Sequence, residues 1–278
     1  MISGTTSWLG VMGMPVKHSL SPRLHNFWLV QHKIDAVYLP LPVPPEQLPA
    51  IIKALPHLGC RGVNVTIPHK EPLLKLLDSV DPLATQIGAV NTVVVQSDGK
   101  LWGTNTDAFG FAASVKAAGH ALDVGSALVL GAGGAARAVL ASLRHAGCRQ
   151  IYLTNRSAAR AETLVQHIGG NIQLIPWLEW PQYLPDVSLL INTTSCGLNG
   201  QDDFDLPLDD LPRDAAVCDL VYRPLMTGLL RSAAQADRQV IDGLGMLLYQ
   251  AQESFRHWFG IAPPVDIDLR RFVLAGLA

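Results

Sequence analysis

Three small residues, Gly131, Gly133 and Ala136, stand at the spacing G-x-G-x-x-A, directly after four apolar residues that predict a short buried strand at 127–130. A helix of small residues is expected over 135–145. Strand, glycine turn and helix in this order indicate a dinucleotide site, because glycine permits a tight turn and lets a pyrophosphate approach the backbone. The helix N-terminus adds N–H groups and the positive end of its dipole. The alternative is that these residues only pack tightly.

The residues after the next expected strand, 150–154, indicate which dinucleotide is bound. Asn155, Arg156 and Ser157 end that strand, and Arg160 follows one helical turn later. An NAD site usually carries an acidic residue about 20 residues past the glycines to hold the ribose 2′-hydroxyl. Here arginines stand instead, and their guanidinium groups match phosphate oxygens. The sequence therefore predicts NADP, against the alternative that both arginines are ordinary surface charges.

A second group of polar residues follows the expected strands of the first hundred residues. It comprises Ser19, Ser21, Asn64, Thr66, Lys70, Asn91, Thr106 and Asp107. Open α/β sheets bind ligands beyond the carboxyl ends of their strands, and hydroxyls and amides with one cation suit a polyhydroxylated, monoanionic small molecule. Lys70 and Asp107 are the charged pair of this set, and a sheltered lysine exchanges a proton with a hydroxyl that loses hydride. The alternatives are helix caps for Ser21 and Asp107 and a surface charge for Lys70.

The elements that position these residues alternate along the chain. Strands are expected at 8–13, 36–43 and 62–66, and helices at 22–33, at 44–58 and after Lys70. This alternation favours a parallel α/β sheet. A β-hairpin with an Asp-Gly turn is expected at 91–96 and 101–105, which makes the first sheet mixed but mostly parallel.

A second α/β domain, of the Rossmann type, is expected around the glycine turn. Beyond the elements above it contains a helix at 108–118, strands at 189–192 and 217–220, weaker strands at 172–174 and 240–241, and a surface loop at 201–213. Helices at 243–258 and 268–276 have no place in it and are expected to return to the first domain. The predicted domains are therefore 1–106 plus 243–278, and 107–242.

Composition excludes several functional classes. The chain has 278 residues, of which 49% are hydrophobic and 16% charged, so it is long and apolar enough for a sizeable core. A net charge of −2 gives no basic surface for nucleic acid or membranes. The four cysteines are not spaced as in a metal-binding motif or a disulfide framework. The sequence shows no pattern typical of a signal peptide or a membrane-spanning segment. A cytoplasmic protein with reduced thiols and no metal is expected.

The polar segments occur in an order that resembles shikimate dehydrogenases across essentially the whole chain. The motifs that carry the resemblance are 13–26 (GMPVKHSLSPRLHN), 62–70 (GVNVTIPHK), 88–92 (GAVNT), 105–110 (NTDAFG), 131–137 (GAGGAAR), 155–160 (NRSAAR), 191–194 (INTT), 221–224 (VYRP) and 243–250 (GLGMLLYQ). The resemblance implies NADP-dependent, reversible oxidation of shikimate to 3-dehydroshikimate in aromatic amino-acid biosynthesis.

The resemblance also implies a role for individual residues. Lys70 transfers the proton and pairs with Asp107. The substrate residues are Ser19, Ser21, Asn64, Thr66, Asn91, Asp107, Tyr222 and Gln250. The cofactor residues are Gly131, Ala132, Gly133, Gly134, Ala135, Asn155, Arg156, Ser157 and Arg160, with Leu220 and Gly243 on the nicotinamide side.

Some positions depart from the family pattern, and several functions stay open. Pro82 replaces an acid of some members, Leu198 and Arg223 are uncommon in their motifs, and His69 is interpreted as a turn residue. The alternatives are a quinate/shikimate dehydrogenase with relaxed substrate or NAD use, a methylene-tetrahydrofolate dehydrogenase, and a catalytically silent NADP-binding paralogue. Either a monomer or a homodimer fits the sequence.

Overall fold

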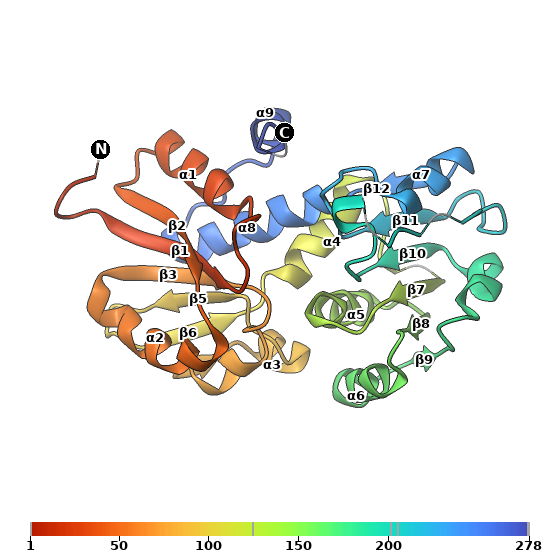
Figure 1. The fold of residues 1–278 in the computed structure, drawn as a ribbon, viewed down its shortest axis with the longest axis horizontal. Coiled ribbons are helices and arrows are strands. Elements are labelled where there is room, and N and C mark those ends of the chain that lie inside the picture. The colour runs from red at the N-terminus through yellow and green to blue at the C-terminus, as the bar shows by residue number, and fades with distance from the viewer. Residues whose placement is uncertain (1, 124, 201, 205, 277–278) are drawn as a thin grey trace. The chain divides into compact units, whose positions relative to one another are not determined.

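The computed structural model describes residues 2–123, 125–200, 202–204 and 206–276. The chain divides into two compact units (Figure 1). Unit 1 comprises Met1–Thr106 and Leu248–Ala278, and unit 2 comprises Asp107–Leu247. The return to the first domain was predicted at Gly243, whereas this division falls after Leu247, inside one helix, α8 (Gly243–Phe259).

Unit 1 is built on a six-stranded sheet with the order β2-β1-β3-β5-β6-β4. Its strands are β1 (Ser7–Gly13), β2 (Ala36–Pro42), β3 (Cys60–Val65), β4 (Ser79–Val80), β5 (Thr92–Val95) and β6 (Leu101–Thr104). β1 is parallel to β2 and β3, and β5 is antiparallel to β3 and β6. The expected mixed sheet with an added hairpin is confirmed.

Helices cover both faces of this sheet. On the face toward α2 (Leu48–Ala54), Val63 and Val93 of the sheet pack in one apolar cluster with Ile52 of the helix. On the opposite face, α1 (Ser21–Gln31) and α8 contribute Trp28, Phe255 and Trp258 to an aromatic cluster around His25 and Tyr38. Burial among these rings lowers the pKa of His25 to about 3, so its imidazole is neutral. The last helix of unit 1 is α9 (Ile267–Leu274).

The connections of unit 1 differ from the expected helices. The helix expected at 44–58 is broken into η1 (Pro45–Gln47), α2 and η2 (Leu55–Leu58). The helix expected after Lys70 is only a 3₁₀ turn, η3 (Pro72–Lys75), because hydrogen bonds from Val90 N to Lys70 O and from Leu101 N to Asp78 Oδ2 fix the chain on either side of it.

Two corrections concern helix starts. A short helix, α3 (Pro82–Ile87), was not expected, although Asp81 caps it by accepting from Leu83 N and Ala84 N. Aspartate followed by proline is a typical helix start, so the signal was present. Ser21 was expected to cap α1, and this is wrong: Leu20 is the N-cap residue, and Ser21 is the first helical residue.

Unit 2 contains an all-parallel six-stranded sheet with the order β12-β11-β10-β7-β8-β9. Its strands are β7 (Ser126–Leu130), β8 (Gln150–Thr154), β9 (Ile172–Leu174), β10 (Leu189–Asn192), β11 (Ala216–Asp219) and β12 (Gln239–Ile241). The strand order reverses between β7 and β10, which is where such sheets bind ligands. The Rossmann-type architecture is confirmed.

Helices of unit 2 cover both faces of its sheet (Figure 1). α4 (Asp107–Ala117), α5 (Gly134–Ala146) and α6 (Ala158–Ile168) pack on one face, and α7 (Gly228–Gln235) packs with η4 (Trp180–Asp186) on the other. A 3₁₀ turn, η5 (Leu198–Gly200), follows β10. Of the loop expected at 201–213, residues 201 and 205 lie outside the described residues, and the rest forms neither helix nor strand.

Candidate functional site

The turn after β7 requires glycine at position 131. Gly131 has a φ of +105°, and a Cβ there would lie 2.8 Å from both Thr193 Oγ1 and Thr194 Cγ2. Its N–H donates to Thr154 O at 2.8 Å, which joins the ends of β7 and β8. The backbone conformation and the close neighbours both exclude a larger residue.

At position 133 the absence of a side chain leaves space for a ligand, and the backbone conformation does not require glycine. It has an ordinary φ of −96°, and a Cβ built on it would meet nothing within 4 Å. It precedes α5, and in the described structure no side chain caps this helix N-terminus. Open space beside uncapped N–H groups suits a phosphate, so these residues fit the pyrophosphate of a dinucleotide.

The end of β8 carries the residues expected to contact a 2′-phosphate. Asn155 Oδ1 accepts from Ala132 N at 3.2 Å, and its Nδ2 donates to Ser157 O at 2.9 Å, so Asn155 ties the glycine turn to the loop before α6. Arg156 and Arg160 are exposed, and among the described residues neither guanidinium has an ion pair or hydrogen bond. Both are available to an anionic ligand.

Substituting the two glycines separately will distinguish their roles. Gly131→Ala is expected to lower the free energy of unfolding by about 1–3 kcal/mol, because alanine is strained at this φ and collides with Thr193 and Thr194. Gly133→Ala is expected to change it by less than about 0.5 kcal/mol but to raise the Kd for NADP about tenfold or more, because its methyl group fills the phosphate space. Urea unfolding and NADP titration measure both effects. Equal destabilisation by the two alanines would contradict this assignment.

A buried carboxylate holds the loops at the ends of β10 and β11. Asp219 Oδ1 accepts from Asn192 Nδ2 and Val221 N, each at 2.9 Å, and its Oδ2 accepts from Thr227 Oγ1 at 2.7 Å. Desolvation raises the pKa of Asp219 from 3.8 to about 6, and the three hydrogen bonds offset part of that rise. Asp219 thereby fixes the chain that leads to Leu220 and Tyr222.

Stability is expected to depend on pH through Asp219. Because the pKa is raised in the folded state, this group favours folding below pH 4 and loses that contribution as the pH rises through about 6. We compare the free energy of unfolding of wild type with that of Asp219→Asn. The difference, wild type minus variant, should be larger at pH 4 than at pH 7.5 by at most about 3 kcal/mol. Urea unfolding of both proteins at each pH measures this difference, and a difference independent of pH would contradict the assignment.

The expected nicotinamide residues lie together in unit 2. A Cβ on Gly243 would lie 2.4 Å from Leu220 O and 2.8 Å from Val221 O, so only glycine permits this approach of α8 to the end of β11. Tyr222 follows directly and is half-buried, and burial raises the pKa of its hydroxyl. The hydroxyl is therefore protonated at neutral pH.

In unit 1, hydrogen bonds join the loops after β1 and β3. Thr66 N donates to Met12 O at 2.8 Å, and Met14 N donates to Ile67 O at 3.0 Å. Ser21 N donates to Ser19 Oγ at 3.3 Å, and Ser19 and Thr66 are half-buried. Both loops, with their hydroxyl groups, are thus held at the carboxyl ends of neighbouring parallel strands.

Lys70 follows β3 in a chain segment anchored on both sides. Its carbonyl accepts from Val90 N at 2.8 Å, and its side chain is half-buried. His69 beside it is 1% exposed, and its Nε2 lies 2.8 Å from Val43 O. This contact gives His69 a structural role that fixes the loop from which Lys70 projects.

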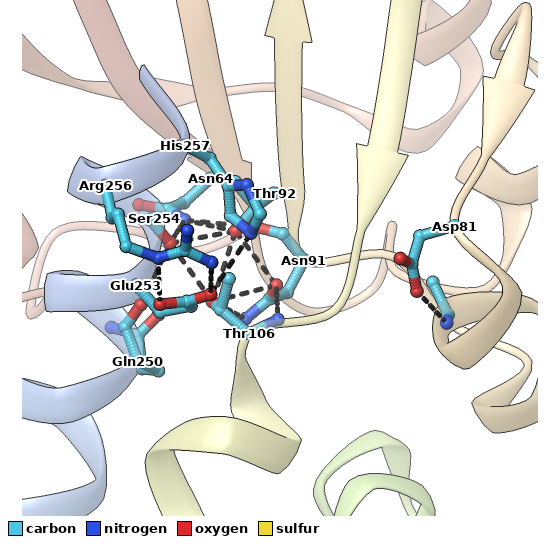
Figure 2. A network of polar contacts seen from close by, with 11 residues as sticks. Asn64, Asp81, Asn91, Thr92, Thr106, Gln250, Glu253, Ser254, Arg256 and His257 are labelled. Carbon is cyan, nitrogen blue, oxygen red and sulfur yellow. Dashed lines mark hydrogen bonds and ion pairs between the residues drawn. The ribbon is translucent and has the colours of Figure 1, made fainter. Parts of the chain in front are cut away.

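Asn91 belongs to a buried polar network, shown in Figure 2. Figure 2 labels Asn64, Asn91, Thr92, Thr106 and Ser254 of this network. Tyr38 also belongs to it, because its hydroxyl donates to Asn64 Oδ1. Asn64 and Thr92 are directly opposite in the β3–β5 register, so their side chains share the sheet face toward α8. The polar atoms of Asn64 are engaged inside this network. Tyr38, Thr92 and Ser254 were not predicted as site residues from the sequence. For Thr92, a polar residue within an apolar strand was the available signal.

Asp107 and Gln250 are both buried, 6% and 8% exposed. Asp107 is the first residue of α4, directly after Thr106, and Gln250 lies one turn before Ser254 on α8. Among the described residues, no cluster of histidine, cysteine, aspartate or glutamate is suited to a metal ion. Within the same residues, no helix combines the length and apolar character needed to span a bilayer.

Three family descriptions match the chain. The shikimate dehydrogenase substrate binding domain matches residues 11–93, shikimate/quinate 5-dehydrogenase matches 113–198, and the shikimate 5′-dehydrogenase C-terminal domain matches 243–270.

Whole-chain comparisons agree with these matches. The shikimate dehydrogenase (NADP(+)) of Paramagnetospirillum magneticum is 50% identical over 276 residues, which cover 99% of this chain and 100% of that protein. The protein of the same name from Rhodospirillum rubrum is 50% identical, with 99% of each chain covered. The crystal structure of shikimate 5-dehydrogenase from Thermus thermophilus in complex with NADP(H) and shikimate has a TM-score of 0.87 and 40% identity, and covers 97% of this chain and 99% of that one.

Proposed function

The chain belongs to the shikimate dehydrogenase family, and from this premise we propose that it catalyses the NADP-dependent, reversible oxidation of shikimate to 3-dehydroshikimate. One observation carries the cofactor assignment: the open space at Gly133 and the uncapped start of α5 occur in the same unit as two arginines without partners among the described residues. The oxidation is a step of aromatic amino-acid biosynthesis.

We propose that unit 1, with the return of the chain after Gly243, binds the substrate. The hydroxyls of Ser19, Ser21 and Thr66 hold the carboxylate, because hydroxyl groups donate well to an anion. Tyr222 is assigned to the substrate as well. The amide and carboxylate groups of Asn91, Asp107 and Gln250 bind the ring hydroxyls, whereas Asn64, also expected in this role, has its polar atoms engaged in the buried network. Lys70 accepts the hydroxyl proton during oxidation and returns it during reduction, assisted by Asp107.

The domain 107–242 is proposed to bind NADP. When bound, NADP supplies the nicotinamide that accepts the hydride and its electron pair from the carbinol carbon. Gly131, Ala132, Gly133, Gly134 and Ala135 bind the pyrophosphate. Asn155, Arg156, Ser157 and Arg160 bind the 2′-phosphate side, while Leu220 and Gly243 line the nicotinamide side.

Two further properties belong to the same proposal. The substrate is a small molecule, and the site requires neither nucleic acid nor a membrane. We place the enzyme in the cytoplasm, where NADP and free thiols are available, as a monomer or homodimer.

Initial rates of cofactor reduction test the proposal. Purified protein is assayed with shikimate or quinate against NADP or NAD. Fast turnover restricted to shikimate with NADP is the expected result. Comparable rates with quinate or NAD would favour the relaxed quinate/shikimate function, and NADP binding without any turnover would favour the silent paralogue.

A further inference from the structure

The amide of Asn91 has one permitted orientation. Thr106 N lies 2.8 Å from Asn91 Oδ1, and a backbone N–H only donates, so the atom that faces it is the oxygen. Thr92 Oγ1 donates to the same oxygen at 2.9 Å. Both lone pairs of Oδ1 are thereby engaged, and Nδ2 is turned toward Thr106 Oγ1 at 3.0 Å.

Three hydroxyl groups behind Asn91 lie within hydrogen-bonding distance of one another (Figure 2). Thr92 Oγ1 is 2.9 Å from Ser254 Oγ and 3.2 Å from Thr106 Oγ1, and Ser254 Oγ is 3.0 Å from Thr106 Oγ1. Each hydroxyl has one hydrogen to donate. The neighbours of the three groups therefore determine where each hydrogen points.

One assignment satisfies every donor and keeps the bond from Thr92 to Asn91; in it Thr106 donates to Ser254, although its hydroxyl also lies 3.2 Å from Asn91 Oδ1. Ser254 donates to Gln250 O at 3.0 Å, which leaves Ser254 Oγ to accept from Asn64 Nδ2 at 2.9 Å and from Thr106. The second hydrogen of Asn64 Nδ2 approaches Thr92 Oγ1 at 3.0 Å. Thr92 then directs its own hydrogen to Asn91 Oδ1.

The location of the network makes this arrangement sensitive to substitution. Thr92 and Ser254 are each 0% exposed, Thr106 is 1% exposed and Asn91 is 2% exposed. Tyr38, whose hydroxyl donates to Asn64 Oδ1 at 2.7 Å, closes the far end of the network. Because these groups are shielded from solvent, a lost hydroxyl leaves its partners unsatisfied.

We propose that Thr92 and Ser254 are positioning residues, which hold the Asn91 amide so that Asn91 acts on the substrate only as a hydrogen-bond donor. The inference rests on the proposed function for the identity of the substrate. Because Asn91 Oδ1 is engaged, a substrate group that contacts this amide does so through Nδ2 and must accept a hydrogen bond. A group that only donates, such as an ammonium in the place of that hydroxyl, is excluded.

Thr92→Val and Thr92→Ser form a matched pair for the test, because valine removes the hydroxyl and keeps the volume, whereas serine keeps the hydroxyl. Thr92→Val is expected to lower kcat/KM for shikimate by about 10- to 100-fold, mainly through KM, and Thr92→Ser by less than about threefold. Ser254→Ala should resemble Thr92→Val. The Kd for NADP should stay within about twofold of wild type in all three, since unit 2 binds the cofactor. Equal kcat/KM for the valine and serine variants would overturn the inference.

Two further measurements keep the inference testable if the valine variant fails to fold or if wild type does not oxidise shikimate. Asn91→Asp keeps the acceptor for Thr106 N and Thr92 but removes the donor. The probes are analogues of shikimate in which a single ring hydroxyl is replaced by an ammonium group. We expect Asn91→Asp to bind one of these analogues that wild type does not bind. If wild type binds every such analogue, the inference is overturned.

NMR of the protein without ligand measures hydrogen exchange of the Asn91 side-chain amide, which depends on the network. Slow hydrogen exchange of the Asn91 side-chain amide is expected in wild type and Thr92→Ser, and its loss in Ser254→Ala. If the wild-type protein shows slow exchange of this amide but does not oxidise shikimate, the proposed function is refuted and the positioning role of Thr92 and Ser254 is not. Fast exchange in wild type would overturn the positioning role.

Discussion

Replacing Lys70 with methionine will lower kcat for shikimate oxidation by about 10²- to 10⁴-fold, the usual contribution of a positioned acid–base group. Methionine keeps much of the apolar stem but has no atom that exchanges the hydroxyl proton. The fold should persist, because the backbone carbonyl at this position, which accepts from Val90 N, is kept in the variant. Steady-state rates with NADP, together with urea unfolding, measure both expectations.

Lys70→Arg separates proton transfer from charge. Arginine retains the positive charge but stays protonated at any ordinary pH, so it attracts the substrate without accepting a proton. We expect Lys70→Arg to keep the Kd for NADP and to be nearly as slow as Lys70→Met. A kcat above about one tenth of wild type for Lys70→Arg would show that charge suffices and would refute the proton-transfer role.

Removing both Arg156 and Arg160 will raise the Kd for NADP by about 10²-fold and leave the Kd for NAD nearly unchanged, because a hydrogen bond to a charged group contributes about 1.5–3 kcal/mol. The two cofactors differ only in the 2′-phosphate, so the loss should appear only with the phosphorylated one. Titration of the Arg156→Ala/Arg160→Ala variant with each dinucleotide measures the change in preference.

Arg149→Ala is the matched control for this double variant. Arg149 is also exposed, but it precedes β8 instead of following it, so it lies at the opposite end of the same strand. Removing its charge should alter both Kd values by less than about twofold, since exposed charges at such a distance are largely screened. An equal loss of NADP preference in Arg149→Ala, or an equal loss of NAD affinity in the double variant, would contradict a specific phosphate contact.

Much of the fold follows from local sequence. The strands at 150–154 and 189–192 were predicted with the bounds that β8 and β10 have, because short apolar runs between turn residues form buried strands whatever surrounds them. The hairpin of β5 and β6 follows from the Asp-Gly turn between alternating segments. The glycine turn at 131 was also predicted, since its spacing reflects backbone geometry.

Local pattern failed where distant contacts decide the conformation. The leucines after Lys70 have helical spacing, yet η3 ends after one turn because neighbouring segments hold both of its ends. Ser21 is a typical cap residue, but the helix begins one residue earlier than a serine cap requires. The roles of Lys70, Asp107 and the other site residues stay predictions until the variants are measured.

The sequence by itself determined the two α/β domains, the dinucleotide turn, the arginines that favour NADP and the family, because each depends on residues close together in the chain. Only the tertiary structure decided how Asn91 is oriented. Ser254 lies 190 residues from Asn64 and 162 from Thr92 along the chain, and no local spacing relates them. Their hydroxyl and amide groups meet because α8 packs on the sheet face that carries Asn64 and Thr92, and burial there obliges each polar group to find a partner.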